Sequence, residues 1–293
     1  MTSIPEPVAR HQSVVHHAGF DYTAGSPHLR HRALHQRVVG TCRDVVRDVL
    51  ARWGHCRVLE VGAGHGTFTD HVAALGAEVW VTELSQDSAT RLADRFRHNP
   101  AVHVRHDPDG TAAASLGTFD VVLCLSVLHH IPDYLAAVGQ YVGQIAPGGA
   151  FVSYQDPLWY PRRGRVSRLV DRGAYLTWRL GRPGRARGLA SLSRRLRGAY
   201  DDDLPGDAVE YHVVRLGVDE EALEKLLRER FPDVRVDRYW STQAGPLQWL
   251  GERFGPPTTF GLVATGAHAR RGPCSGQAAP LPGGNGAAGH AVS

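Results

Sequence analysis

A glycine-rich turn in the first quarter of the chain follows an isolated acidic residue. The segment from Val58 to Gly66 reads VLEVGAGHG, so Glu60 lies in an apolar run that ends at Gly62 and Gly64. Glycines between a strand and a helix let the backbone approach a ligand, and a buried carboxylate is costly without a cationic partner. The segment therefore predicts a small-molecule site in which Glu60 accompanies an ammonium group, with tight packing as the alternative role of the glycines.

The spacing of these glycines does not fit a nicotinamide cofactor. The dinucleotide-binding pattern G-x-G-x-x-G requires a glycine at position 67, where the chain has Thr67, and the third glycine is Gly66 instead. A nicotinamide oxidoreductase is therefore disfavoured.

A pair of histidines follows a second apolar run. The segment from Phe119 to Asp133 reads FDVVLCLSVLHHIPD and contains His129 and His130. Imidazole has a pKa of about 6.5, so a histidine can remove a hydroxyl proton near neutral pH. His130 is the preferred base and His129 the second candidate, because adjacent side chains usually point apart. A structural hydrogen bond at the loop is the alternative role of His130.

Together the two segments resemble the class I S-adenosylmethionine-dependent methyltransferases. The first motif of that family is E-x-G-x-G-x-G, which Glu60 to Gly66 match, and the histidine segment is similar to its D-x-V-x-x-x-x-V-L-H-H-x-x-D stretch. The resemblance extends over roughly Tyr22 to Thr265. It implies a Rossmann-like fold, S-adenosyl-L-methionine as cofactor and methyl transfer without a metal.

The resemblance also implies roles at the cofactor. Glu60 would lie near the methionine amino group, and the two carboxylate oxygens of Glu83 would bind both ribose hydroxyls. Asp107 would lie beside the adenine amino group, although Pro108 after it has no N–H for the ring. Capping of the next helix is the alternative for Glu83, and a turn role is the alternative for Asp107. The predicted cofactor-binding residues are Tyr22, His31, Glu60, Gly62, Ala63, Gly64, Glu83, Leu84, Asp107, Leu125 and Ser126.

Catalysis is expected from histidine and aspartate. Methyl transfer is one in-line displacement, so the protein mainly aligns the reactants and excludes water. Some small-molecule O-methyltransferases of the family combine a histidine after strand four with an acid after strand five. The predicted catalytic residues are therefore His130 and His129, with Asp156 orienting His130 or binding the acceptor. Tyr22 and His31 resemble residues that close over the methionine end of the cofactor, and N-terminal packing is their alternative role.

Strands and helices alternate along most of the chain, which predicts an α/β fold with a doubly wound, Rossmann-like sheet of seven strands. The sheet would be mostly parallel, with an antiparallel final hairpin at its edge and a cap insertion after strand five. Predicted helices cover residues 34–50, 89–96, 134–145 and 219–231, and a further helix follows Gly66. Predicted strands cover residues 57–61, 78–82, 102–105, 119–125, 150–154, 234–240 and 259–265.

We expect five segments along the chain. They are a flexible N-terminus (1–16), a cofactor-binding core with N-terminal closing helices (17–156), an arginine- and aromatic-rich cap over the acceptor site (157–210), the end of the core sheet (211–268) and a disordered tail (269–293). The cap aromatics Trp159, Tyr160, Tyr175 and Trp178 either line a pocket for a ring-shaped substrate or form the small core of the cap itself.

Composition narrows the function further. Among 33 basic residues Lys225 is the only lysine, and the arginine-rich stretch from Arg162 to Arg197 precedes an acidic run, which favours a solvated lid over a nucleic-acid track. The four cysteines form no C-x-x-C pair, so neither zinc nor a disulfide framework is indicated. No apolar signal core or membrane-spanning stretch is present. We expect a cytoplasmic protein with no nucleic-acid or membrane partner, either a monomer or a homodimer.

The expected activity is methylation of a hydroxyl on a small cyclic natural product, in antibiotic or secondary-metabolite biosynthesis. N-methylation of an amino sugar or alkaloid is the closest alternative. A cofactor-binding, pericyclase-like homologue that transfers no methyl group is another. The near absence of lysine and of a separate recognition module disfavours an RNA methyltransferase.

Overall fold

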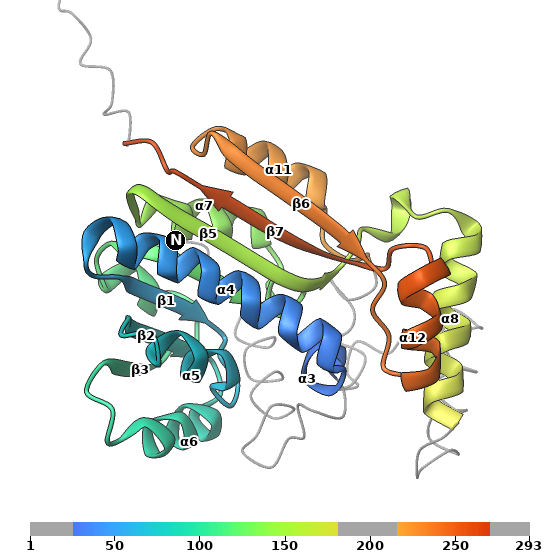
Figure 1. Cartoon of the computed structure of the whole chain (residues 1–293), viewed down its shortest axis with the longest axis horizontal. Helices are drawn as coiled ribbons and strands as arrows, with labels where there is room; N and C mark the ends of the chain where they lie inside the picture. The colour runs from blue at the N-terminus through green and yellow to red at the C-terminus, as the bar shows by residue number, and fades with distance from the viewer. Residues whose placement is uncertain (1–25, 181–215, 270–293) are drawn as a thin grey trace, which may run out of the picture.

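A seven-stranded sheet forms the centre of the structure, a computed structural model that describes residues 26–180 and 216–269 (Figure 1). The strand order is β3-β2-β1-β4-β5-β7-β6. The strands are β1 (Arg57–Val61), β2 (Glu78–Glu83), β3 (Val102–His106), β4 (Phe119–Leu125), β5 (Ile145–Pro157), β6 (Asp233–Tyr239) and β7 (Thr259–Thr265).

The first five strands run parallel, and β7 pairs antiparallel with both β5 and β6. The predicted fold class, with its antiparallel final hairpin, is therefore confirmed. The chain order along the sheet reverses between β1 and β4, and ligands of open α/β sheets bind outside the carboxyl ends of the strands at such a switch point. The carboxyl ends of β1, β2, β4 and β5 thus define the place to look for a site.

Helices cover both faces of the sheet, as Figure 1 shows. The helices of the regular fold are α3 (Pro27–Arg30), α4 (Arg32–Trp53), α5 (Thr67–Ala73), α6 (Gln86–Phe96), α7 (Tyr134–Gly143) and α11 (Glu220–Arg228). One core lies under α4, α5 and α6, and a second lies under α7 and α11. Alternate residues of the buried strands point into opposite cores: Val58 into the first, Leu59 into the second.

Local capping explains where several helices begin. The side chain of Ser85 accepts a hydrogen bond at the start of α6, Asp133 does so for α7, and Asp219 does so for α11. The aspartate that completes the histidine segment is thus a helix cap.

Two further helices lie outside the regular pattern. The first, α8 (Arg165–Leu180), follows the short 3-10 helix η3 (Tyr160–Arg162) and belongs to the predicted cap. The second, α12 (Gly245–Phe254), occupies the connection between β6 and β7, where no helix was predicted. This helix is short and begins with Gly245 and Pro246, which are typical of turns, so no helical period is recognisable in the sequence.

Some predicted segments fall outside the described residues. These are the N-terminus 1–16, residues 181–210 of the cap and residues 270–293 of the tail. None of the described helices is long and apolar enough to cross a membrane.

Candidate functional site

The glycine turn between β1 and α5 has a backbone that disfavours other residues. Gly62, Gly64 and Gly66 have φ values of 65°, 57° and 76°. A Cβ atom at Gly62 would lie 2.6 Å from Cγ2 of Val127, and one at Gly66 would lie equally close to Phe96. Tight packing is therefore a real role of Gly62 and Gly66, beside any contact with a ligand.

Glu60 is a buried carboxyl group that accepts a side-chain hydrogen bond. It is 1% exposed, and its Oε2 accepts a hydrogen bond of 2.6 Å from the hydroxyl of Thr69. No basic side chain pairs with it among the described residues. Burial raises the pKa of Glu60 from its ordinary value of 4.5 to about 7, and the negative charges of Asp70 and Glu83 act in the same direction. An incoming cationic group would therefore favour its ionised form.

Glu83, at the end of β2, supports the glycine turn. Its Oε2 accepts a hydrogen bond from the backbone N–H of Gly64 at 2.9 Å, and its Oε1 accepts one from Ser85 at 3.2 Å. Burial raises the pKa of Glu83. The cap of α6 is Ser85, so helix capping does not account for Glu83. Each carboxylate oxygen accepts more than one hydrogen bond, which leaves capacity for a ligand hydroxyl.

Asp107, after β3, takes part in a turn. Its Oδ1 accepts a hydrogen bond from the N–H of Ala112 at 3.0 Å, and its own N–H donates to the carbonyl of Glu83. Burial raises the pKa of Asp107. The turn role considered for Asp107 is present, and its adenine contact stays a prediction.

The remaining predicted cofactor residues lie along the same carboxyl edge. Leu125 is buried at the end of β4, and Ser126 follows with a φ of 58° and donates its N–H to the carbonyl of Tyr154. Ala63 and Leu84 are half-buried beside the glycine turn and after β2.

Two residues near the N-terminus were predicted to close over the methionine end of the cofactor. Tyr22 lies outside the described residues. His31 contacts the carbonyl of Thr242 through Nε2 at 2.9 Å, which ties the start of α4 to the segment after β6 and supports the packing role. His28, which sequence reasoning missed, is buried against the ring of Phe68.

The environment of His28 keeps its ring neutral. Burial lowers the pKa of His28 to about 3, and the neighbouring His129 and His35 act in the same direction. Its Nδ1 has no hydrogen-bond partner among the described residues. A lone histidine at the start of a helix carries no sequence signal that would separate it from a surface residue.

The structure places Asp156 beside His129, the second candidate for the base. Oδ1 of Asp156 lies 2.7 Å from Nδ1 of His129 and also accepts the backbone N–H of His129 at 3.1 Å. The role of His130 as a base stays a prediction. Both histidines lie on the 3-10 helix η2 (Leu128–His130), and their ring centroids are only 4.0 Å apart. The expectation that the two side chains point apart is therefore wrong, because the tight 3-10 turn keeps them together.

A bulge in β5 gives Asp156 its direction. Gln155 has a φ of 70°, and the pairing of β5 with β7 shifts register between Tyr154 and Asp156. In a regular strand residues three apart point to opposite faces, yet the hydroxyl of Ser153 donates to Oδ2 of Asp156 at 3.0 Å. The extra residue thus turns the fully buried Asp156 toward the end of β4.

The candidate site therefore has two parts at one sheet edge. Glu60, Glu83 and the glycine turn lie on the β1–β2 side of the switch point, and the His129–Asp156 pair follows β4 and β5. The first part can hold a cationic and hydroxylated ligand, and the second can accept a proton.

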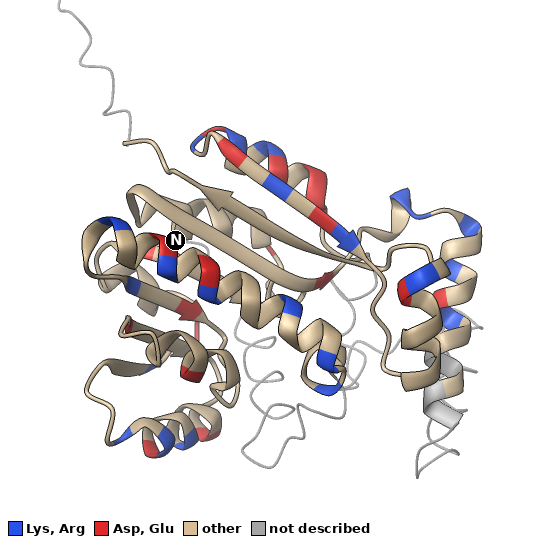
Figure 2. Ribbon diagram, viewed as in Figure 1, with Lys and Arg blue, Asp and Glu red and all other residues tan. Residues whose placement is uncertain are grey.

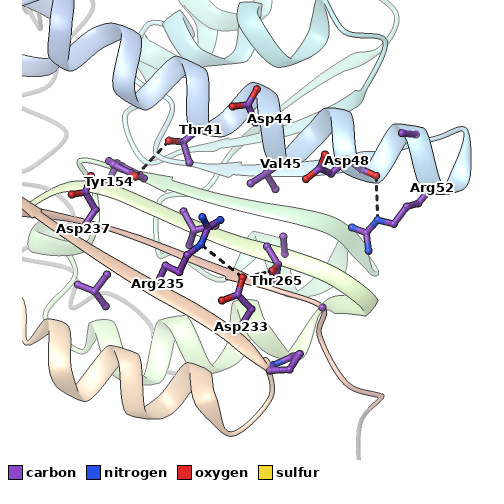
Figure 3. A pocket seen from close by; sticks show the side chains of 16 residues that line it. Thr41, Asp44, Val45, Asp48, Arg52, Tyr154, Asp233, Arg235, Asp237 and Thr265 are labelled. Carbon is purple, nitrogen blue, oxygen red and sulfur yellow. Dashed lines mark hydrogen bonds and ion pairs between the residues drawn. The ribbon is translucent and has the colours of Figure 1, made fainter.

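A separate groove lies on another part of the molecule. It has a volume of about 890 Å³ and runs between α4 and the strands β6 and β7 (Figure 3). Its polar lining includes Asp233, which pairs with Arg235 and accepts a hydrogen bond from the hydroxyl of Thr265. No residue of the candidate site lines this groove.

Comparison with known proteins gives a match in the centre of the chain. Residues 59–151 match a family model described as a methyltransferase domain. The ubiquinone biosynthesis O-methyltransferase of Psychrobacter cryohalolentis is 34% identical over 130 residues, which cover 41% of this chain and 51% of that protein. The enzyme of the same name from Ralstonia nicotianae is 35% identical over 96 residues, which cover 32% of this chain and 40% of that protein. The chain spans about half the length of the first of these relatives and less than half the length of the second.

Among solved structures, the N-methyltransferase NodS of Bradyrhizobium japonicum in complex with S-adenosyl-L-homocysteine is similar. It shares 16% identity and has a TM-score of 0.49, covering 87% of this chain and 97% of that one.

Proposed function

We propose that this chain is an S-adenosyl-L-methionine-dependent methyltransferase that acts on a hydroxyl of a small molecule. Its residues 59–151 match the methyltransferase domain family, as the sequence predicts. The observation that carries the proposal is the buried carboxyl of Glu60, which has no basic partner among the described residues and lies at the switch point of the sheet. A carboxyl group in this position is stabilised in its ionised form by a ligand ammonium group.

The described residues fit this cofactor. Glu60 would take the amino group, and the free acceptor positions on the oxygens of Glu83 would take the ribose hydroxyls. When bound, S-adenosyl-L-methionine supplies an electrophilic methyl group on a sulfonium sulfur. Asp107, Leu125 and Ser126 are proposed to line the rest of the cofactor site.

The His129–Asp156 pair is proposed as the acid–base machinery. A carboxylate only accepts hydrogen bonds, so Nδ1 of His129 carries the proton shared with Asp156 and Nε2 is left basic. Nε2 can then receive the proton of an acceptor hydroxyl, while Asp156 stabilises the resulting imidazolium. The hydroxyl of Ser153 and the backbone N–H of His129 hold Asp156 in place.

This pair favours oxygen over nitrogen as the methyl acceptor. A hydroxyl gains most nucleophilicity from losing its proton, and a neutral amine needs no prior deprotonation. N-methylation of an amino sugar or alkaloid remains the second candidate. We also propose that the segment 157–210 covers the acceptor, and that the acceptor is a cyclic natural product.

The experiment is a methylation screen of the full chain. The protein is incubated with methyl-labelled S-adenosyl-L-methionine and with polyketide phenols, amino sugars, indole alkaloids and ubiquinone precursors, the last because two matched relatives are named for ubiquinone biosynthesis. A labelled product with an O-methyl group is expected, and an N-methyl product would favour the second candidate.

Cofactor binding is measured in parallel by calorimetry with S-adenosyl-L-methionine, S-adenosyl-L-homocysteine and a nicotinamide dinucleotide. Tight binding of the first two without a product from any acceptor would favour the non-methylating homologue. Absence of binding would contradict the proposal.

A further inference from the structure

Helix α8 shows an apolar stripe to solvent. Val166 is 73% exposed, Leu169 is 71% exposed and Val170 is also exposed. The three residues recur at steps of three and four, so they share one helix face. Monomeric proteins rarely leave such a contiguous apolar face uncovered unless it binds a partner.

A second side of α8 carries polar contacts that run along the helix itself. Arg163, just before the helix, is buried and donates to Asp171 at 2.8 Å and to the hydroxyl of Ser167. Among the side chains of α8 that the structure describes, Ala174 is buried. Val166, Leu169 and Val170 stay exposed, so packing within the described part of the chain does not explain the apolar stripe.

Arginines border one side of the apolar stripe. Arg165, Arg168 and Arg172 are exposed and recur at helical spacing. None of them pairs with a carboxylate in the part of the chain that the structure describes. The exposed part of α8 therefore combines an apolar stripe with a positively charged border. Figure 2 shows several basic residues along this helix.

Helix α12 lies at the same end of the longest axis of the molecule as α8 (Figure 1). It exposes large apolar side chains, with Phe254 at 80% and Trp249 at 60%, and it exposes Leu250 as well. The guanidinium of Arg253 lies over the ring of Trp249, 5.0 Å from its centroid. This helix repeats the combination of exposed apolar and basic groups seen on α8.

We propose that this end of the molecule, formed by α8 and α12, docks on the surface of a membrane that contains anionic lipids. A helix with an apolar face and arginines along its border lies in the plane of the membrane interface, with the apolar face among the acyl chains and the arginines at the lipid phosphates. Tryptophan side chains, such as that of Trp249 on α12, are also enriched at the membrane–water interface. Neither helix has the length and apolarity of a membrane span.

Charge distinguishes this partner from a second copy of the chain. A symmetric dimer through the same face would place two sets of arginines, Arg165, Arg168 and Arg172 of each copy, in one interface, which is unfavourable. An anionic lipid surface neutralises the same residues. The proposal departs from the expectation that the chain has no membrane partner. The sequence provides no reason to expect a membrane partner, because the helical spacing of Val166, Leu169 and Val170 does not reveal that these residues are exposed.

The test is cosedimentation of the full chain with vesicles at low ionic strength. Binding is expected to vesicles of phosphatidylcholine with phosphatidylglycerol and to weaken steeply for phosphatidylcholine alone or at high salt. Replacement of Arg165, Arg168 and Arg172 by glutamine should weaken binding by about a hundredfold. The matched control replaces the exposed arginines Arg47, Arg97 and Arg235, which lie on other elements, and should retain most of the affinity.

The apolar stripe is tested with Val166→Glu combined with Leu169→Glu, and Leu135→Glu on α7 is the control for an exposed apolar residue elsewhere. The double variant should lose vesicle binding, with thermal unfolding and sedimentation velocity unchanged from the parent. Equal vesicle binding by parent and double variant would overturn the proposal. A lower melting temperature would show that the stripe is covered within the chain, and loss of a dimer would show that it binds a second copy; either result would also overturn it.

Discussion

Nδ1 of His129 lies 2.7 Å from Oδ1 of Asp156, and this contact joins the carboxyl ends of β4 and β5. The contact depends on the bulge at Gln155, which turns Asp156 to the same side as Ser153. It leaves Nε2 as the basic nitrogen of His129. The proposed chemistry of the site follows from this geometry.

Replacement of His129 tests the proposed base. His129→Gln should lower turnover roughly 10²- to 10⁴-fold, because the amide of glutamine does not take up the hydroxyl proton. Steady-state kinetics with an acceptor found in the screen would measure turnover, and calorimetry would measure cofactor binding. Binding of the cofactor should be retained. His130→Ala is the matched control, and a larger loss of turnover there than in His129→Gln would restore His130 as the base.

The orientation of His129 is tested through Ser153. Ser153→Ala removes one hydrogen bond to the carboxylate of Asp156 and should lower turnover by about threefold to tenfold. Asp156→Asn should lower turnover far more, since an amide does not stabilise imidazolium as a carboxylate does. The pH profile of turnover distinguishes positioning from a merely structural role: both variants should shift its acid limb, and unchanged limbs would contradict the assignment.

Glu60 predicts a pH dependence of cofactor affinity. Its pKa of about 7 in the free protein means that Glu60 must lose a proton before an ammonium group can pair with it. Affinity for S-adenosyl-L-methionine should therefore be highest above pH 7 and fall by about tenfold for each pH unit below it. Calorimetry over this range measures the effect. In Glu60→Gln the affinity should be weak and nearly independent of pH across the same interval, and a profile parallel to that of the parent would rule out Glu60 as the cause.

The same residue predicts a pH-dependent stability of the free protein. The pKa of Glu60 is raised from 4.5 to about 7, so the folded state binds the proton more tightly than the unfolded chain. The stabilisation by the protonated form is fully present below about pH 4.5 and is lost as pH rises through about 7. Relative to the parent, Glu60→Gln should therefore gain stability between these values, by roughly 3 kcal/mol above pH 8. Urea unfolding of both proteins without cofactor, below pH 4.5 and above pH 8, checks this. A difference in unfolding free energy between variant and parent that is the same at both pH values would contradict it.

Gly62 predicts a packing defect at the turn. Gly62→Ala would combine a φ of 65° with a Cβ atom 2.6 Å from Cγ2 of Val127, and should destabilise the protein by about 2 kcal/mol. The double variant with Val127→Ala removes the close contact and leaves the unfavourable φ. Urea unfolding should show that the second substitution costs less in the Gly62→Ala background than in the parent. Purely additive losses would exclude the clash.

The sequence alone predicted the alternating strands, the glycine turn and the two acidic residues beside it. These features depend on local properties: apolar periodicity, the φ values that glycine allows, and the position of Glu60 and Glu83 in or at the end of a strand. A parallel sheet brings the carboxyl ends of neighbouring strands to one edge, so the approximate location of the site followed from the same pattern.

Only the tertiary structure decided which histidine contacts Asp156 and which apolar residues of α8 are exposed. The first depends on a single additional residue in β5, at Gln155, since a bulge reverses the side to which the following side chain points. The second depends on the polar contacts of Arg163 with Asp171 and Ser167, which run along one side of α8, while Val166 and Leu169 are exposed. In both cases the direction of a side chain is set by contacts between residues on different turns or strands, and periodicity along the chain does not encode that direction.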